Sequence, residues 1–182
     1  TNQQFIYAGT GDSFGGGIFK SIDGCNTWTL TNNGLPNNPV NSIVIDPKNT
    51  QIVYAGTSAG VFKSTNGGLS WGSSNQGLQN YPDIRTLAID PKNTQIIYAG
   101  NHDWQNSYVF KSINGGTSWS CSSSGLTSQH LSSVVIDPKH PDTLYVGTKF
   151  GPGVYKLNNE DGILYLSSYV NSGLTSTYVN CL

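Results

Sequence analysis

The sequence has few charges, no long hydrophobic run and no basic excess. Its 182 residues include 9 Lys or Arg and 10 Asp or Glu, which gives a net charge of −1. Such a balance lacks the electrostatic footprint of a protein that binds nucleic acid or an anionic membrane. No apolar run approaches the roughly 18 to 20 residues that a membrane-spanning helix needs. We therefore expect neither a nucleic acid partner nor a membrane span.

Metal and cofactor chemistry is not indicated either. The 3 cysteines and the 3 histidines are scattered along the chain and show no C-x-x-C spacing, which a zinc site would need. We predict no metal site and no cofactor, and because 3 is odd, at least one thiol is free or pairs with another chain. The chain begins at Thr1 without methionine and shows no signal peptide, which we interpret as a processed, trimmed or excerpted start.

Short motifs recur along the chain at a nearly constant spacing. The Ile-Asp-Pro-Lys turn appears three times, and its aspartates are separated by 44 residues (Asp46 to Asp90) and by 47 (Asp90 to Asp137). Tyr-Ala-Gly and Phe-Lys-Ser segments recur with it. A period in the forties with about four strands per unit is typical of propeller blades. The sequence predicts an all-β fold, a β-propeller of about four antiparallel four-stranded blades.

The clearest unit runs from Val40 to Trp71 and sets the boundaries of the others. Its short apolar runs are divided by turn residues such as Asp46-Pro47 and Gly67-Gly68, as expected for an antiparallel meander. We expect a single repeat domain, 1–182. Its units are 1–39, 40–83, 84–130 and 131–178, with 179–182 as the first strand of a further blade.

The turn before each tryptophan follows one pattern in three units. Residues 21–28, 64–71 and 112–119 read S-x-D/N-x-G-x-x-W, with Cys25 at the glycine position of the first. These turns resemble Asp-box repeats, also called bacterial neuraminidase repeats. Such repeats occur in propellers of bacterial surface proteins, xyloglucan-degrading glycosidases, sortilin-type domains and photosystem II assembly factors. The resemblance implies a β-propeller, with the repeats stabilising blade turns rather than binding ligand.

The chemistry of this turn is structural. The Asp or Asn side chain can accept backbone N–H bonds within its own turn, and the tryptophan can pack between sheets as a large apolar side chain. We expect the three tryptophans to be buried at equivalent positions. In the fourth unit Tyr165 replaces the tryptophan, so no Asp box is expected there. The expected structural residues are Asp23, Trp28, Asn66, Trp71, Asn114 and Trp119.

Catalysis is not favoured by the acidic and basic residues. Sialidases with this repeat use three arginines to hold a carboxylate, whereas this chain has only Arg85. A glycosidase needs two carboxylates that face each other. Asp12 and Asp103 lie in equivalent loops two units apart and are the weak candidates for such a pair. We expect no catalytic residues beyond these.

A binding site is expected on the face opposite the pre-tryptophan turns (residues 21–28, 64–71 and 112–119). Loops between the second and third strands open there, together with loops that enter the next blade. Aromatic side chains in them can stack on sugars or apolar groups, and amides and acids can orient a ligand. Trp104 could instead fill the central channel. The candidates are Phe14, His102, Asp103, Trp104, Lys149 and Phe150 from the first loops, and Tyr81, Asp83, Arg85 and His130 from the second.

Three functions follow from this interpretation. The favoured one is a non-catalytic propeller at the cell surface or outside the cell that binds carbohydrate or another protein. The second is a structural repeat of a surface assembly or filament without a small ligand, which suits the sparse charge and the near-identical units. The third is a fragment of a glycoside hydrolase propeller.

The two ends of the sequence match complementary parts of one blade. Residues 179–182 match the first strand at 40–43, whereas residues 4–8 match a second strand. Unpaired strand edges are avoided in folded proteins, so we expect these ends to pair. Pairing can close a ring within one molecule or join copies of the chain into a larger ring or filament. The sequence favours pairing between copies.

Overall fold

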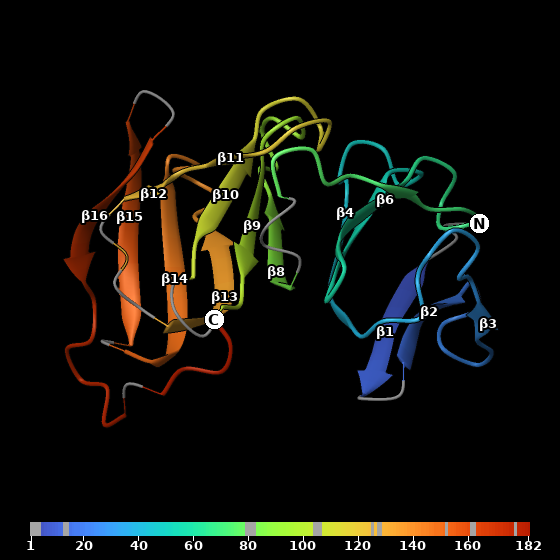
Figure 1. The fold of residues 1–182 in the computed structure, drawn as a ribbon, viewed down its shortest axis with the longest axis horizontal. Helices are drawn as coiled ribbons and strands as arrows, with labels where there is room; N and C mark the ends of the chain where they lie inside the picture. Colours follow the sequence, from blue (N-terminus) through green and yellow to red (C-terminus); the bar gives the residue numbers. More distant parts are fainter. Residues whose placement is uncertain are drawn as a thin grey trace.

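The computed structural model describes residues 5–12, 15–78, 83–103, 107–124, 126, 129–151, 153–160, 163–176 and 178–182. These residues contain strands, turns and loops and no helix. They form four sheets that follow one another along the chain and fan out in an open arc (Figure 1). We number the sheets as blades 1 to 4. The predicted all-β architecture of about four antiparallel blades is confirmed.

Blades 1 and 2 show the predicted meander, with neighbouring strands antiparallel. Among the described residues, blade 1 has three strands. Its strands are β1 (Ile6–Asp12), β2 (Gly15–Ser21) and β3 (Thr29–Leu30). Those of blade 2 are β4 (Val40–Ile45), β5 (Val53–Thr57), β6 (Gly60–Ser64) and β7 (Gly72–Ser73).

Blade 3 repeats this order, whereas blade 4 differs at its outer edge. Blade 4 has five strands because β12 pairs in parallel with β16, so the chain enters this sheet before the predicted boundary at residue 131. The strands of blade 3 are β8 (Ile84–Ile89), β9 (Ile97–Asn101), β10 (Val109–Ser112) and β11 (Ser120–Cys121). Those of blade 4 are β12 (Ser123–Ser124), β13 (Gln129–Ile136), β14 (Thr143–Phe150), β15 (Val154–Glu160) and β16 (Ile163–Tyr169).

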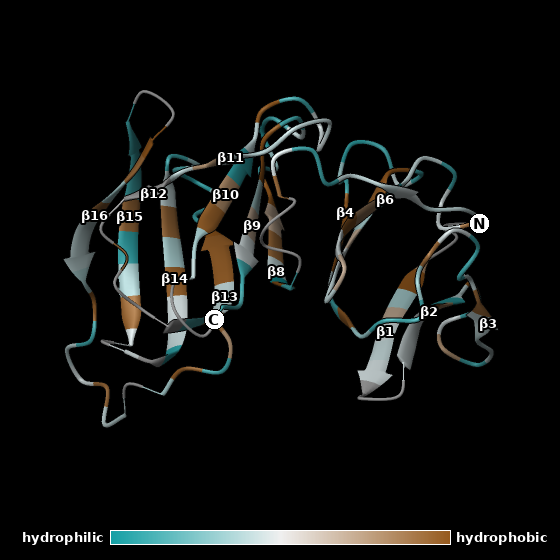
Figure 2. Cartoon of the chain, in the orientation of Figure 1, coloured by the Kyte–Doolittle hydropathy of each residue, from teal (hydrophilic) through white to brown (hydrophobic). Residues whose placement is uncertain are grey.

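The hydrophobic core lies between the blades. Each of three clusters combines side chains from two neighbouring sheets, as where Tyr54 and Val61 of blade 2 pack with Ile97 and Phe110 of blade 3. Figure 2 shows hydrophobic residues concentrated within strands such as β10 and β13. A single sheet of this size buries too little on its own, so each blade is stabilised by its neighbours.

The pre-tryptophan turns are closed by their own side chains. In blade 2 the Ser64 hydroxyl accepts the Gly68 N–H at 2.8 Å, and Asn66 Oδ1 accepts the Ser70 N–H at 2.9 Å. The same bonds recur in blades 1 and 3. In blade 1 the hydrogen bonds from Thr27 are the main cause that lowers the pKa of Asp23. The side chains of Asp23, Asn66 and Asn114 thus each bond a backbone N–H within their own turn.

The turns of blades 2 and 3 also connect their blades to the preceding blade. Lys20 Nζ and the Tyr7 hydroxyl of blade 1 both donate to the Gly67 carbonyl of blade 2, at 2.7 and 2.9 Å. Lys63 and Tyr54 of blade 2 donate to the Gly115 carbonyl of blade 3, at 2.8 and 2.9 Å. Burial is the main cause that raises the pKa of Tyr54 to about 12. The hydroxyl therefore remains a donor at neutral pH.

Two of the tryptophans add hydrogen bonds in the reverse direction, from the following blade to the preceding one. The Trp71 indole donates to the Thr31 carbonyl of blade 1 at 2.8 Å, and the Trp119 indole donates to the Ser74 carbonyl of blade 2 at 2.7 Å. Both side chains are 6% exposed. The expectation that Trp28 is equally buried is wrong, because Trp28 is 40% exposed. Each of the other two packs against the preceding blade, and blade 1 has none before it in this structure.

Cys25 occupies a strained backbone position, which gives a first prediction. Its φ is +73°, and the equivalent residues Gly68 and Gly116 have φ of +85° and +81°. A residue with a Cβ pays about 1–2 kcal/mol in this region. Cys25→Gly should therefore raise the free energy of unfolding by about 1 kcal/mol, measured by urea denaturation. The matched reverse change, Gly68→Ala, should lower it, and an unchanged midpoint for both variants would contradict the strain argument.

The structure also bears on the cysteines, on metal sites and on membrane-spanning helices. Cys25, Cys121 and Cys181 are exposed free thiols. Within the described ranges, no cluster of His, Cys, Asp and Glu has the arrangement of a metal site. In the same ranges, no helix of the length and hydrophobicity needed to span a membrane is found.

Candidate functional site

The sheets present two different ends, because neighbouring strands are antiparallel. The Asp-Pro-Lys turns and the pre-tryptophan turns lie at one end, which we call the turn face. The ends of β5, β9 and β14 and the starts of the first strands β4, β8 and β13 lie at the other, the bulge face. In Figure 1 the arrowhead of β9 points to the bulge face. Among the described candidates, Asp83, Arg85, His102 and Lys149 lie at these strand ends.

Each first strand is interrupted at the same position. Val40 pairs with Thr57 and Ser42 with Gly56, so Asn41 is an extra residue without a partner in the ladder. The same register shift leaves Arg85 extra in β8 and Ser132 extra in β13. A β-bulge re-aims the side chain of its extra residue. In each of these three strands, the repeat therefore directs the side chain of one variable residue to an equivalent position.

These bulge residues share one hollow of about 260 Å³ on the bulge face. Because the first strands of consecutive blades lie side by side, the hollow lies along the inner side of the arc. Its described lining residues are polar apart from one leucine. The lining residues are Asn41, Arg85, His102, His130, Leu131, Ser132, Lys149 and Asn180.

The Asp83 carboxylate contacts three of the side chains that line the hollow. Its Oδ2 accepts Arg85 Nε at 3.2 Å and Nη2 at 2.9 Å, and lies 3.3 Å from His102 Nδ1. Its Oδ1 accepts Asn41 Nδ2 at 3.4 Å. The Asp83 side chain is 23% exposed and that of Arg85 is 43% exposed. The carboxylate thus orients groups from two blades without pointing an unpaired oxygen at the hollow.

Two histidines meet beside Asp83. His102 Nε2 and His130 Nδ1 form a hydrogen bond, and the two ring centroids lie 4.4 Å apart. His130 has a φ of +71°, and its backbone N–H donates to Ser107 Oγ at 3.1 Å. The pKa of His102 is lowered, first by burial and then by the positive charge of Arg85, while Asp83 acts in the opposite direction. His102 is therefore neutral at neutral pH.

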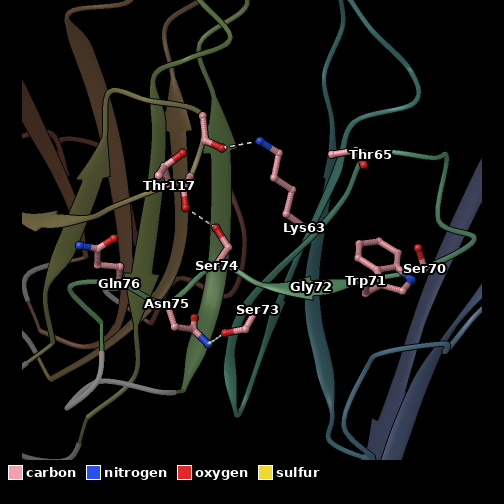
Figure 3. A pocket seen from close by; sticks show the side chains of 12 residues that line it. Lys63, Thr65, Ser70, Trp71, Gly72, Ser73, Ser74, Asn75, Gln76 and Thr117 are labelled. Carbon is pink, nitrogen blue, oxygen red and sulfur yellow. Dashed lines mark hydrogen bonds between the residues drawn. The ribbon is translucent and has the colours of Figure 1, made fainter.

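A larger hollow of about 890 Å³ lies between the outer parts of blades 2 and 3 (Figure 3). Its polar groups already serve the contacts between these blades. Lys63 Nζ donates to the Gly115 carbonyl, and the Ser74 hydroxyl donates to the Gly116 carbonyl. Asn75 Nδ2 donates to Ser73 Oγ at 3.0 Å. We interpret this hollow as a structural groove between blades and not as the functional site.

Comparisons with known proteins were made at three levels. No protein-family model and no curated protein matches the sequence. Among solved structures, a GH74 enzyme from Niastella koreensis is similar, with 28% identity and a TM-score of 0.69. An ancestral GH74 enzyme is also similar, with 26% identity and a TM-score of 0.67. The fold is a β-propeller.

The propeller matches cover most of this chain and a minor part of the other proteins. The alignments cover 89% and 85% of this chain but only 27% and 22% of the two GH74 enzymes. The extracellular domain of a putative hybrid two-component system from B. thetaiotaomicron covers 97% of the chain, with 17% identity and a TM-score of 0.70. At that identity the likeness shows the fold alone. The chain spans about a quarter of the GH74 enzymes that it matches.

Some of the residues predicted from the sequence lie together in the hollow on the bulge face. His102 and Arg85 line it, together with Lys149 and His130, and Asp83 lies behind them. Asp103 does not line it, and its N–H donates to Ser107 Oγ at 3.3 Å. Phe150 ends β14 opposite Gln129. Asp12 ends β1 opposite Gly15. Three further candidates, Phe14, Tyr81 and Trp104, lie outside the described residues.

Sequence reasoning missed Asn41, Ser132 and Asn180. The signal was present in the repeat: the first strands begin Val-Asn-Ser, Ile-Arg-Thr, Leu-Ser-Ser and Val-Asn-Cys. Their second position is polar and varies, whereas the first is always aliphatic. A bulge at this position was not inferred, because the register depends on the partner strand.

Proposed function

We propose that the chain is part of a non-catalytic extracellular propeller that binds a glycan in the hollow on the bulge face. The pre-tryptophan turns would then be Asp boxes with a structural role on the opposite face. The observation that carries the proposal is the repeated bulge, which brings Asn41, Arg85 and Ser132 from three blades to one polar hollow. Amide, guanidinium and hydroxyl groups suit the hydroxyls of a sugar.

The comparisons support this proposal indirectly. The two GH74 enzymes share 26% and 28% identity with the chain, whereas a further match named a GH74 xyloglucanase has 15% identity and shows the fold alone.

The alternative is a segment of a glycoside hydrolase. Such an enzyme needs two facing carboxylates. Asp83, the described acid next to the hollow, bonds Arg85, His102 and Asn41 and is therefore a positioning group. Asp12 and Asp103 stay weak candidates for a catalytic pair. Release of reducing ends from a polysaccharide, lost in Asp103→Asn, would support the hydrolase over the binding module.

A glycan array followed by calorimetry tests the binding function. The chain should bind one class of glycan, and Arg85→Ala should weaken that binding about tenfold or more, since hydrogen bonds to a charged group are lost. The control is Lys139→Ala, which changes an exposed lysine in a turn on the opposite face. No bound glycan, or equal affinity for the wild type and Arg85→Ala, would refute the proposal.

A second role, assembly through residues 179–182, is supported by a repeated contact between first strands. The Leu87 N–H donates to Ser42 Oγ and the Val134 N–H donates to Thr86 Oγ1, each at 3.0 Å. The equivalent Ser133 Oγ is buried and makes no hydrogen bond in the described part of the chain. When the repeats are aligned, the group that would donate to Ser133 Oγ is the N–H of Leu182.

The position of Val179 supports the same role. A Cβ built on Gly147 would lie 2.9 Å from Val179 Cγ1, much as one on Gly9 would lie 2.8 Å from Val40 Cγ1. Val179 thus lies against blade 4 as the first residue of β4 lies against blade 1. Its N–H donates to the Thr148 carbonyl at 2.9 Å. The segment is therefore held where the first strand of a following blade belongs.

The other end of the arc offers a place for such a strand. Among the described residues β1 pairs with β2 alone, and a hollow of about 220 Å³ lies between β1 and β4. Residues 179–182 of the same chain do not fill it, because they lie against β14 at a distance from β1 (Figure 1). We propose that this segment of a second copy pairs with β1.

A further inference from the structure

We propose that the hollow on the bulge face binds the carboxylate of an acidic sugar, so that the glycan is a polymer containing uronic acid. This inference rests on the proposed glycan-binding function and adds the chemical class of the ligand. It is carried by two cationic side chains, Arg85 and Lys149, that line one polar hollow.

The positive charge in the hollow is only partly balanced. The Arg85 guanidinium has five N–H groups and donates two of them in hydrogen bonds to Asp83. Lys149 lines the same hollow, and its ammonium group makes no hydrogen bond or ion pair within the described ranges. Among the described residues around the hollow, one acid, Asp83, thus faces two cations, Arg85 and Lys149. An anionic ligand group would restore the balance.

The geometry favours a carboxylate. A guanidinium presents parallel N–H donors that match the two oxygens of a carboxylate, while an ammonium acts as a point charge beside it. Asp83 holds the Arg85 side chain by two bonds to one oxygen, at 2.9 and 3.2 Å. Arg85 lies in β8 and Lys149 in β14, so neighbouring blades supply the two charges. Asp83 is a positioning residue in this arrangement.

The rest of the lining favours a sugar over an acidic peptide. Asn41, Asn180 and Ser132 supply amide and hydroxyl groups, and among the described residues Leu131 is the one aliphatic side chain of the lining. Ser132 Oγ is buried and has no hydrogen-bond partner within the described ranges. A buried polar atom without a partner is costly. A ring hydroxyl next to the carboxylate of a uronic acid would supply that partner.

His102 makes this binding pH-dependent. The charged and titratable groups around His102 are Asp83, Arg85, Lys149 and His130. Burial, the largest cause, and the cations lower the pKa of His102, so it adds its positive charge only below the usual range of histidine. A bound carboxylate favours the protonated ring and raises this pKa. Affinity for an acidic sugar should therefore increase as the pH falls from about 7 to about 5.

The test compares a short oligogalacturonate with its methyl ester, which keeps the ring hydroxyls and removes the charge. By calorimetry the full chain should bind the acid about tenfold or more tightly than the ester. Lys149→Gln should reduce this preference severalfold, whereas Lys139→Gln on the turn face should leave it unchanged. The preference should increase at about pH 5 in the wild type and less in His102→Gln.

The possible results separate this inference from the proposed function. Equal binding of acid and ester, or binding of neutral glycans alone, would overturn the acidic ligand while leaving a glycan-binding propeller. A glutamate-rich peptide that binds as tightly as the oligogalacturonate, and is weakened equally by Lys149→Gln, would overturn the sugar. Failure to bind any glycan would refute both proposals.

Discussion

Replacing Trp71 or Trp119 with alanine should lower the free energy of unfolding by about 3 kcal/mol, whereas Trp28→Ala should cost less than about 1 kcal/mol. The three tryptophans stand at the same position of the repeat, so the expected difference is due to their surroundings. Trp71 and Trp119 are 6% exposed and donate to carbonyls of the preceding blade, whereas Trp28 is 40% exposed.

Urea denaturation of the monomeric chain measures this difference. Trp71→Phe serves as a further control, because it keeps an aromatic ring and loses the indole N–H that bonds the Thr31 carbonyl. It should cost less than Trp71→Ala, which also leaves a cavity. Equal losses for alanine at all three positions would show that each tryptophan stabilises its own turn rather than the contact between blades.

The repeat made the blades predictable from sequence, but not the environment of each copy. Apolar runs and turn residues place strands such as β5 and β6 correctly, because strand length and turn chemistry are local properties. The burial of Trp28 was predicted wrongly for a different reason. Burial in a repeat protein depends on the neighbouring unit, and blade 1 has no preceding blade here.

The candidate site was predictable only in part. Arg85 and His102 were recognised because charged and aromatic groups in loops suggest binding. Asn41 and Ser132 were missed because a bulge is a property of two paired strands. Their shared position is visible in the register, in which the ladders skip the same residue in β4, β8 and β13. The contact between His102 and His130, which are 28 residues apart, likewise requires the packing of two blades.

Deleting residues 178–182 should abolish assembly of the chain. In the proposed register these residues pair with β1 of a second copy as β4 pairs with β5, where Ser42 faces Gly56 and Ile43 faces Ala55. Cys181 would then face Gly9, and Leu182 would face Ala8. Each contact joins one end of a copy to the opposite end of the next, so it generates a ring or a filament. Sedimentation velocity should show concentration-dependent assemblies for the full chain and monomers for the deletion variant.

Two further measurements separate strand pairing from other causes of assembly. Cys181→Ser places a hydroxyl where β4 has Ser42, so it should preserve assembly, whereas an assembly held by a disulfide would dissociate. In an assembly, Trp28 should pack against blade 4 of the preceding copy, as Trp71 packs against blade 1. Its fluorescence should then shift to shorter wavelength as concentration rises, and Trp28→Phe identifies its contribution. A full chain that stays monomeric, or a Trp28 signal that does not change during assembly, would refute pairing between copies.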